Sequence, residues 1–300
     1  MLNKNIINGW INLYKPTGIS SAKIVAKVKH LLNALKVGHA GTLDLEAEGV
    51  LPIAIGEATK LVPYIMEAKK DYVFTIKFWA KTDTGDASGK IEKTTDYIPT
   101  YNECLAISKK FIGKITQIPP KYSALKIKGI RAYNLARQNQ ELVIPSRKVT
   151  IFDLKLKSYD HKNLTATYYT SCSKGTYIRT LSEDIALSLQ SLSFVIKLTR
   201  TRVGCFYACD SVSLNIDHLN KKESTIYLKE YIMNTEIVLD DIPVLTINDK
   251  VAQRIRQGQL VQFKLADCPL LQLQYNNNLI AIGVLKDNCF KSLRVFNFKN

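Results

Sequence analysis

One aspartate lies inside a glycine-rich stretch that ends in an apolar run. Residues 37–52 read VGHAGTLDLEAEGVLP, in which Asp44 stands between Gly41 and Gly49, with His39 shortly before it. Glycine permits positive φ and lets the backbone approach a ligand closely, so an acid framed in this way can be a presented catalytic group. The same pattern also suits a turn residue or a helix cap, and this stretch alone does not separate the two interpretations.

A second stretch offers a cation for that carboxylate. The sequence GTYIRT places Arg179 beside a glycine turn at the start of a predicted helix. If the fold brings Arg179 to Asp44, the ion pair keeps the carboxylate ionised, and it can then act as a nucleophile or base without a metal or cofactor. Tyr72 and Tyr177 offer ring faces for a nucleobase, and His39 can stack or hydrogen-bond beside it. Each of these three residues also has an equally good interpretation as a packed ring or a turn residue.

Other catalytic motifs are absent or incomplete. The chain has no G-x-x-x-x-G-K-[ST] pattern, which excludes a P-loop nucleotidase. Residues 20–23 (SSAK) match S-x-x-K, but no S-D-N or K-T-G accompanies them. The DTG triplet at 83–85, a signature of aspartic proteases, follows WAKT rather than an apolar lead-in. Glycoside hydrolysis needs two carboxylates that flank the bond, and nothing in the sequence makes Glu46 or Glu48 face the aspartate.

The composition favours a polyanionic partner. Lys and Arg number 42 and Asp and Glu 26, so the net charge is +16, with an isoelectric point near 9.4. Such an excess suits nucleic acid better than an acidic membrane, and a protein that is merely basic is the simpler alternative. No stretch approaches the roughly 18 apolar residues of a membrane helix. With 300 residues, 46% of them hydrophobic, the chain is long enough for one large domain and a small one.

The cysteines give no sign of a metal site or a disulfide framework. They are scattered, and no histidine stands at ligand spacing from them. Such cysteines usually pack as small apolar residues in a reducing compartment, and the start of the chain lacks the pattern of a signal peptide. We therefore expect a cytoplasmic protein without a metal centre. The residues concerned are Cys104, Cys172, Cys205, Cys209, Cys268 and Cys289.

Residues 118–148 form a strongly basic stretch in which cations alternate with tyrosines. Glu141 is the only acid among them, and Tyr122 and Tyr133 lie between the cations. Phosphates and bases are bound by this combination, which favours an RNA-contacting loop over a solvated surface excursion. The cations are Lys121, Lys126, Lys128, Arg131, Arg137, Arg147 and Lys148.

The rest of the chain predicts a mixed α/β body followed by a β-rich C-terminal unit. A short strand over 10–14 precedes a helix over 22–36, which Ser20 or Ser21 can cap and Gly38 can end. Further strands are predicted at 72–80, 149–157, 164–172 and 193–206, and a helix at 173–189 with Ile178, Leu181 and Ile185 inward. Near the end, LLQLQY, the turn NNN, LIAIGVLK and LRVFNF predict a small antiparallel sheet.

Five separated motifs, in this order, resemble the TruB family, the bacterial-type tRNA pseudouridine synthases. They are GWINLYKPTGISS, GHAGTLDLEAEGVLP with GEATKL, KTDTGDASGKI, IPPKYSALKIKGIRAY and CSKGTYIRTLSEDI. The resemblance spans roughly residues 9 to 206. The tail, with RIRQGQLVQF and LIAIGVLK, resembles more weakly the PUA-like domain of that family. The DTG triplet then belongs to the family's loop T-D-T-x-D-x-x-G, which removes the protease interpretation.

The resemblance implies an isomerase that converts uridine 55 in the T loop of tRNA to pseudouridine. It makes Asp44 the catalytic nucleophile and Arg179 its partner, with Lys15 and Pro16 as structural support. Substrate contacts would come from the loop histidine, the aromatic residue that stacks on the flipped uracil, and two further positions. These residues are His39, Tyr72, Tyr177 and Leu198.

The implied fold is of the α+β type: a mixed, largely antiparallel sheet of the pseudouridine synthase fold, flanked by helices. It occupies residues 1–235, residues 236–300 form the PUA-like RNA-binding domain, and the thumb-like insertion at 118–148 closes over the T arm. The implied partner is tRNA, with no cofactor, no metal, no membrane and no obligate protein partner, and a monomer suits the family. Within the insertion, the expected RNA contacts are Lys121, Lys126, Lys128, Arg131 and Arg137.

Two positions depart from the family pattern. Leu45 stands where proline usually follows the aspartate, which frees φ at that step, and Glu48 stands where a small hydroxyl residue is usual. Neither change removes a catalytic group. The sequence does not choose between attack at C1′, attack at C6 and proton abstraction at C2′. A guide-RNA-dependent relative and a tRNA-binding or refolding protein without catalysis are the alternative functions.

Overall fold

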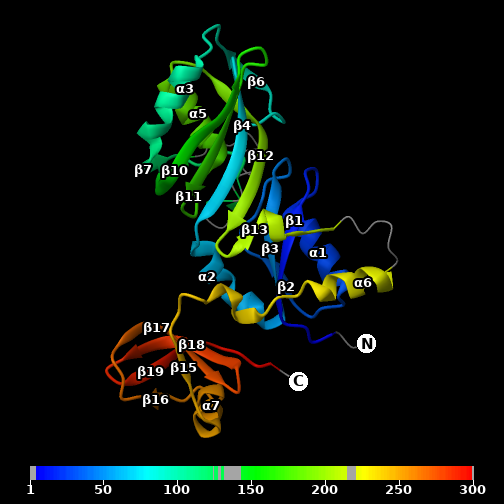
Figure 1. The fold of residues 1–300 in the computed structure, drawn as a ribbon, viewed down its shortest axis with the longest axis vertical. Helices are drawn as coiled ribbons and strands as arrows, with labels where there is room; N and C mark the ends of the chain where they lie inside the picture. The colour runs from blue at the N-terminus through cyan, green and yellow to red at the C-terminus, as the bar shows by residue number, and fades with distance from the viewer. Residues whose placement is uncertain (1–4, 124, 128–129, 132–142, 215–220, 299–300) are drawn as a thin grey trace.

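The computed structural model describes residues 5–123, 125–127, 130–131, 143–214 and 221–298. Figure 1 shows a long, twisted sheet with helices packed along it and a smaller C-terminal sheet beside one end of it. The large sheet contains ten strands and is mixed, because β1 pairs with β14 and β12 with β3 in parallel while its other strand pairs are antiparallel. This is the predicted α+β arrangement.

The strands of the large sheet follow an order that brings distant segments together. Along the main path they are β14 (Val212–Ser213), β1 (Gly9–Lys15), β3 (Glu48–Ile55), β12 (Ser193–Val203), β4 (Lys70–Phe78), β11 (Thr165–Cys172), β10 (Arg147–Asp160) and β7 (Gly113–Gln117). Two short strands lie off this path, β2 (Val37–His39) beside β3 and β13 (Phe206–Tyr207) beside β12. Strand β12 therefore joins the N-terminal strands to the rest of the sheet.

Helices cover the two halves of this sheet separately. The described helices are α1 (Ser21–Leu31), α2 (Val62–Glu67), α3 (Tyr101–Ile107), α5 (Ile178–Ser188), α6 (Lys221–Glu230) and α7 (Asp249–Arg256). Short 3-10 turns lie at η1 (Gly56–Leu61), η2 (Ser108–Phe111), η3 (Ala208–Asp210) and η4 (Thr235–Val238), and two hairpins are formed by β5 (Ala80–Thr82) with β6 (Ile91–Thr94) and by β8 (Lys126–Ile127) with β9 (Ile130–Arg131). None of the helices within the described part of the chain has the length and apolar character that a membrane crossing requires.

Each half of the large sheet has its own apolar core. We call the boundary between the two halves, where β3 pairs with β12, the seam. One core packs α1 and α6 on β1 and β3, and includes Ile24, Val28 and Leu228. The other packs α3 and α5 on β4, β10 and β11 and includes the residues predicted to face inward from the second helix: Ile178, Leu181 and Ile185. Burial of such aliphatic side chains contributes about 1.5–3 kcal/mol each, which is what holds α5 against the sheet.

The C-terminal strands form a separate five-stranded sheet. The three strands that the sequence predicted here pair in antiparallel fashion, but a short strand at Val244–Thr246 pairs in parallel with Cys268–Tyr275. The strands of this sheet, in order, are β15 (Val244–Thr246), β17 (Cys268–Tyr275), β18 (Asn278–Lys286), β19 (Cys289–Val295) and β16 (Val261–Gln262). The turn between β17 and β18 places Asn276 and Asn277 at φ 48° and 58°, as a tight hairpin requires. A third apolar core joins this sheet to the large one, because Leu279 and Phe296 belong to the same cluster as Trp10.

The first predicted helix is shorter than its apolar periodicity indicated. Helix α1 ends at Leu31 rather than near residue 36, and Asn33 adopts φ 47°, which ends the helical path. Leu35 is therefore exposed instead of lying on the buried face, and Gly38 belongs to β2 instead of ending the helix. Asparagine tolerates the left-handed conformation better than other non-glycine residues, so the helix stops where the first such residue allows it. The N-cap is Ser20, whose hydroxyl accepts from the Lys23 amide.

Gly49, the first glycine after the aspartate loop, is required where β3 pairs with β12, because it lies directly opposite Arg200. Its φ is +112°, and a Cβ there would lie 2.2 Å from the Arg200 carbonyl oxygen. We expect Gly49→Ala to lower the free energy of unfolding by about 4 kcal/mol, of which about 2 kcal/mol is backbone strain and the rest overpacking. Gly113 is the matched control, because its φ is +115° and no atom lies within 4 Å of its Cβ position. Denaturant unfolding of Gly113→Ala should show the strain alone; equal losses would contradict the clash.

Candidate active site

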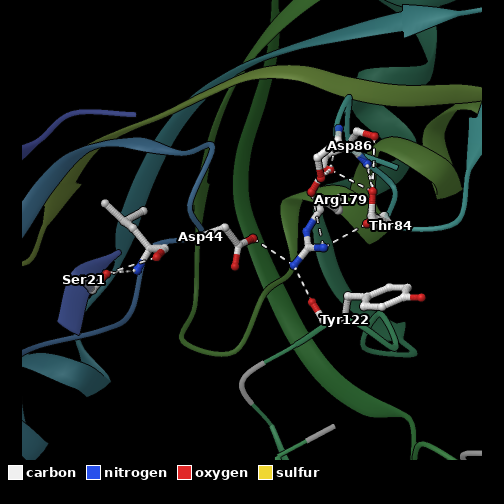
Figure 2. A network of polar contacts seen from close by, with 8 residues as sticks. Ser21, Asp44, Thr84, Asp86, Tyr122 and Arg179 are labelled. Carbon is white, nitrogen blue, oxygen red and sulfur yellow. Dashed lines mark hydrogen bonds and ion pairs between the residues drawn. The ribbon is translucent and has the colours of Figure 1, made fainter. Parts of the chain in front are cut away.

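The structure brings Asp44 and Arg179 together across the seam between the two halves. The loop between β2 and β3 carries Asp44, and the first turn of α5 carries Arg179. Arg179 Nη2 lies 2.9 Å from Asp44 Oδ2, and Figure 2 shows the other carboxylate oxygen pointing away from the guanidinium. The Arg179 side chain is 5% exposed whereas that of Asp44 is 46% exposed. The cation is thus buried, and the carboxylate is accessible from solvent.

Further contacts fix the Arg179 guanidinium on its other sides. Nη1 donates to the Thr84 carbonyl at 2.9 Å and lies 3.5 Å from Asp86 Oδ2, while Nη2 donates to the Tyr122 carbonyl at 3.0 Å (Figure 2). Asp86 is itself held, because its Oδ1 accepts from the hydroxyls of Thr84 at 2.8 Å and Ser88 at 2.6 Å. A planar guanidinium with several fixed acceptors has little freedom to rotate. Its position therefore sets the position of the Asp44 carboxylate.

The backbone on both sides of Asp44 is also held in place. The Ser21 hydroxyl donates to the Leu43 carbonyl at 3.1 Å and accepts from the Leu43 amide at 3.0 Å. The Leu45 carbonyl accepts from the Gly18 amide at 2.9 Å and from Lys15 Nζ at 3.3 Å. Both neighbours of the aspartate are therefore tied to the β1–α1 segment. This fixes the direction in which its side chain leaves the loop.

Lys15 is a fully buried cation whose hydrogen-bond partners are backbone carbonyls. Besides Leu45, its ammonium donates to the carbonyls of Pro16 at 2.8 Å and Ile19 at 2.9 Å. Burial lowers the pKa of Lys15 to about 8, and the nearby Asp44 charge offsets part of that effect. Lys70 is similar: burial lowers its pKa to about 8, and it donates to the Met66 and Ala68 carbonyls.

A second buried arginine joins the predicted aromatic contact to the aspartate loop. Arg200 Nε donates to the Val50 carbonyl and Nη2 to the Gly41 carbonyl, both at 2.8 Å. Burial raises the pKa of Tyr72 to about 12; the Arg200 charge and a hydrogen bond from its side chain oppose this rise, while the Asp44 charge adds to it. The Tyr72 phenol thus keeps its proton at any working pH. Tyr72 lies on β4, next to Arg200 on β12 in the strand register.

The carboxylate opens into a cavity of about 500 Å³. Its walls come from the aspartate loop, the 86–88 turn, the start of α5 and the middle of β12, so both halves of the large sheet contribute. This volume is in the range of ligand sites. The lining residues are Thr17, Asp44, Glu46, Ala47, Glu48, Asp86, Ala87, Ser88, Arg179, Val195, Ile196, Lys197 and Leu198.

Of the residues predicted to contact substrate, Leu198 lines this cavity together with Asp44 and Arg179. His39, Tyr72 and Tyr177 are not among its lining residues. His39 Nε2 lies 3.1 Å from the Thr42 hydroxyl, and Tyr177 is the N-cap residue of α5, held through its backbone by the Gln117 side chain. The guanidinium of Arg147 lies over the Tyr177 ring, 5.5 Å from its centroid.

The predicted RNA-binding residues fall at the boundary of the described chain. Lys121 is exposed, and the register of the β8–β9 hairpin places Lys126 opposite Arg131. Lys128 and Arg137 lie outside the described residues. The hairpin belongs to the same segment as Tyr122, whose carbonyl binds Arg179. The basic insertion therefore begins beside Arg179, which lines the cavity.

Several residues that organise the site were not identified from the sequence. The side chains of Ser21 and Arg200 donate to backbone carbonyls, and Asp86 pairs with Arg179. Neither periodicity nor a motif reveals such contacts between residues far apart in the chain. The aspartate of the T-D-T-x-D loop was noticed only as part of a motif. Among the described residues no group of three or more histidine, cysteine or acidic side chains could hold a metal ion.

Comparison with known proteins agrees with this geometry. The family model described as TruB family pseudouridylate synthase (N terminal domain) matches residues 29–178. The tRNA pseudouridine synthase B of Rickettsia bellii (strain OSU 85-389) is 55% identical over 289 residues, which are 96% of this chain and 98% of that protein. The same enzyme of Rickettsia akari (strain Hartford) is 53% identical over 293 residues, 97% and 99% of the two chains.

Solved structures share the fold. A chain of a Cbf5–Nop10–Gar1 complex superposes with a TM-score of 0.72 at 24% identity, covering 97% of this chain and 85% of that one. A chain of an H/ACA RNP bound to a substrate RNA that contains 2′-deoxyuridine gives 0.71 at 23% identity, covering 96% and 85%. The large mixed sheet is thus that of the pseudouridine synthases. The chain belongs to the TruB family, and its class of activity is the isomerisation of uridine in RNA.

The buried lysine beside the aspartate loop predicts a specific pH dependence of stability. Because the pKa of Lys15 is about 8 in the folded protein and 10.5 ordinarily, the unfolded chain binds more protons between these values. The free energy of unfolding should therefore rise with pH across that window, by up to about 1 kcal/mol per pH unit for each such lysine. Lys15→Met should remove its share and leave that of Lys70. Urea unfolding at several pH values from 7.5 to about 10 measures the slope; identical slopes for wild type and Lys15→Met would contradict the assignment.

Proposed function

We propose that this protein is a tRNA pseudouridine(55) synthase, which isomerises the uridine at position 55 of the T loop. The observation that supports this is the presented Asp44 carboxylate, which is bound on one side by a buried, immobile guanidinium and opens on the other into the cavity. The relatives that match along nearly the whole chain carry the name tRNA pseudouridine synthase B. No cofactor is required for this reaction, because the uracil is both leaving group and incoming group.

In the reaction, the N-glycosidic bond breaks, the uracil turns within the site, and a bond forms from its C5 to C1′ of the same ribose. Asp44 is the group that starts it, as a nucleophile at C1′ or C6 or as the base at C2′. All three routes need an ionised and oriented carboxylate, which the Arg179 contact supports. A proton leaves C5 at the end, and this proton is the one that a tritium label follows.

The cavity supports the requirement that the detached uracil stays bound. Its apolar lining residues on β12 are Val195, Ile196 and Leu198, and its polar lining residues include Asp44 and Arg179. Exclusion of water from such a pocket prevents capture of the reactive sugar. We assign Tyr72 to stacking on the uracil on the basis of the family resemblance; it lies opposite Arg200 in the strand register, and Arg200 binds the Gly41 carbonyl of the aspartate loop. His39 and Tyr177 are assigned to the flanking nucleotide on the basis of the family resemblance.

The phosphate contacts are assigned to the basic insertion and to the C-terminal sheet, which we propose is a PUA-like RNA-binding domain of residues 236–300. The insertion starts at the cavity through the Tyr122 carbonyl, so RNA bound along it reaches Asp44. A T loop presents bases that are already partly unstacked, which lowers the cost of flipping below the usual few kcal/mol. The structural neighbours come from ribonucleoprotein assemblies, but the relatives of high identity are named as tRNA enzymes, which favours action on tRNA without a guide.

The central experiment is tritium release from a T-arm stem–loop labelled at uridine C5. We expect release by wild type without added metal, and a rate at least about a thousandfold lower for Asp44→Asn, because the amide cannot attack or accept a proton. Binding of the stem–loop should change by less than about threefold. Glu46→Gln is the matched control, since Glu46 is an exposed carboxylate that lines the same cavity, and it should keep most of the rate. Tight binding without release by wild type would favour the non-catalytic RNA-binding alternative.

The basic insertion predicts a change in salt dependence. Lys126→Ala and Arg131→Ala should each weaken binding of the stem–loop and reduce the slope of log K against log salt by about 0.7–0.9, the value for one phosphate. Lys162→Ala is the control, because Lys162 is exposed in the turn between β10 and β11, away from the insertion. Binding isotherms at four or five salt concentrations give the slopes. An unchanged slope for both insertion variants would remove this hairpin from the RNA interface.

A further inference from the structure

The mouth of the catalytic cavity carries a lysine that the reaction does not use. Lys197 lies on β12 and lines the cavity together with both of its neighbours, Ile196 and Leu198. Successive side chains of a regular strand point to opposite faces, so three in a row cannot share one cavity. The pairing of β12 with β4 shifts register between Val195 and Lys197. The extra residue on β12 at this shift breaks the regular alternation, and Lys197 Nζ lies 3.6 Å from Oε1 of Glu48, which also lines the cavity.

The cavity is acidic, although the protein as a whole is strongly basic. Of its two lining cations, Arg179 is buried and already binds two carboxylates and two carbonyls. The Lys197 side chain is 67% exposed and has one carboxylate partner, Glu48. Within the described lining, Lys197 is therefore the cation that an incoming phosphate can reach. The charged lining residues are Asp44, Glu46, Glu48, Asp86, Arg179 and Lys197.

The partner of this lysine is held in place by neutral groups. Glu48 is the first residue of β3, opposite Thr199 in the parallel register with β12, and its Oε1 accepts from the Thr199 hydroxyl at 2.9 Å. The Tyr14 hydroxyl also bonds this carboxylate, and burial together with the Glu48 charge raises the pKa of Tyr14. The Glu48 side chain is 23% exposed. Glu48 is thus a fixed anion next to Asp44 in the cavity wall, directed toward β12.

The contact between the two residues is loose. Lys197 Nζ lies 3.6 Å from Glu48 Oε1, beyond the range of a good hydrogen bond. An exposed ion pair of this kind contributes little to stability, because water screens it and the long lysine side chain keeps its freedom. A phosphate offers the same ammonium a stronger, charge-assisted contact. The ion pair between Lys197 and Glu48 can therefore be replaced by a contact between Lys197 and an RNA phosphate at a small cost in free energy.

We propose that Lys197 binds a phosphate of the substrate RNA at the mouth of the catalytic cavity, and that Glu48 holds its ammonium there in the free protein and competes with that phosphate. This inference rests on the proposed function, since it concerns the RNA that enters this cavity. The proposal also explains why carboxylates line the cavity. Carboxylates inside repel a phosphate, so the phosphate stays at Lys197 and the neutral base goes inward.

The binding half of the proposal is tested in the Asp44→Asn protein, so that turnover does not change the RNA during the measurement. We expect Lys197→Met to raise the Kd of the T-arm stem–loop about fivefold to tenfold and to reduce the salt slope by about 0.7–0.9. Lys155→Met is a closely matched control, because the Lys155 side chain is also 67% exposed and also pairs with one carboxylate, that of Asp153 at 2.5 Å. Its Kd and slope should equal those of the parent.

The competition half is tested by a double-mutant cycle. Glu48→Gln keeps an acceptor for the Tyr14 and Thr199 hydroxyls and removes the charge, so it should lower the Kd about threefold to fivefold at low salt. In the Lys197→Met background the same change should alter the Kd by less than about twofold, because there is no ammonium left to release. If Glu48→Gln lowers the Kd equally in both backgrounds, the glutamate acts by general repulsion and the competition is overturned.

The outcomes separate this inference from the proposed function. Wild-type tritium release from the stem–loop, combined with parental Kd and slope for Lys197→Met, would overturn the phosphate assignment and leave the function standing. Absence of both binding and release by wild type would overturn both. Far-ultraviolet circular dichroism and urea unfolding of each variant show whether the fold is kept, and the conservative Lys197→Arg variant should restore the Kd and the salt slope if a cation is what is needed.

Discussion

The site depends on the ion pairs that the buried Arg179 guanidinium forms with the carboxylates of Asp44 and Asp86. A buried cation is costly unless it is paired and fully hydrogen-bonded, and removal of one partner leaves an uncompensated charge. Asp44 is one of its two anions, and the other, Asp86, is fixed by hydroxyl donors of its own turn. The aspartate loop, the 82–88 loop, the segment at Tyr122 and α5 are therefore held together by one side chain. The contacts that orient Asp44 are therefore the same contacts that join the two halves of the sheet.

Charge is divided between the inside and the outside of the site. The protein carries a net charge of +16, which attracts RNA from a distance. Among the charged lining residues of the cavity, carboxylates outnumber cations, and the buried cation, Arg179, is already paired with Asp44 and Asp86. In the proposed function, a positive field around an acidic pocket places the parts of a nucleotide differently. The electrostatic energy of a phosphate is then lower at the rim than inside, and that of a neutral base differs little between the two places.

The sequence predicted much of the fold from local pattern, and the family motifs singled out Asp44 and Arg179, which lie together in the structure. The buried face of α5, the β10–β11 pair and the C-terminal hairpin follow from periodicity and turn residues. The end of α1 was predicted too late, because periodicity continues past Leu31 while one left-handed Asn33 stops the helix. Ser21 and Arg200 were missed as site residues, since each acts on backbone carbonyls far along the chain. Such contacts leave no regular trace in a sequence.

The same carbonyl contacts explain how the aspartate loop keeps its shape without the proline that usually follows the aspartate. Proline would fix φ at position 45, and Leu45 does not. Here the Leu45 carbonyl is instead bound by the Gly18 amide and the Lys15 ammonium, and the Leu43 peptide by both functions of the Ser21 hydroxyl. These hydrogen bonds from the β1–α1 segment restrict the loop backbone, as a proline ring at position 45 would have done. The rigidity of the loop that carries Asp44 is therefore a tertiary property in this protein, and it requires that Lys15 stay buried, which lowers the pKa of that lysine.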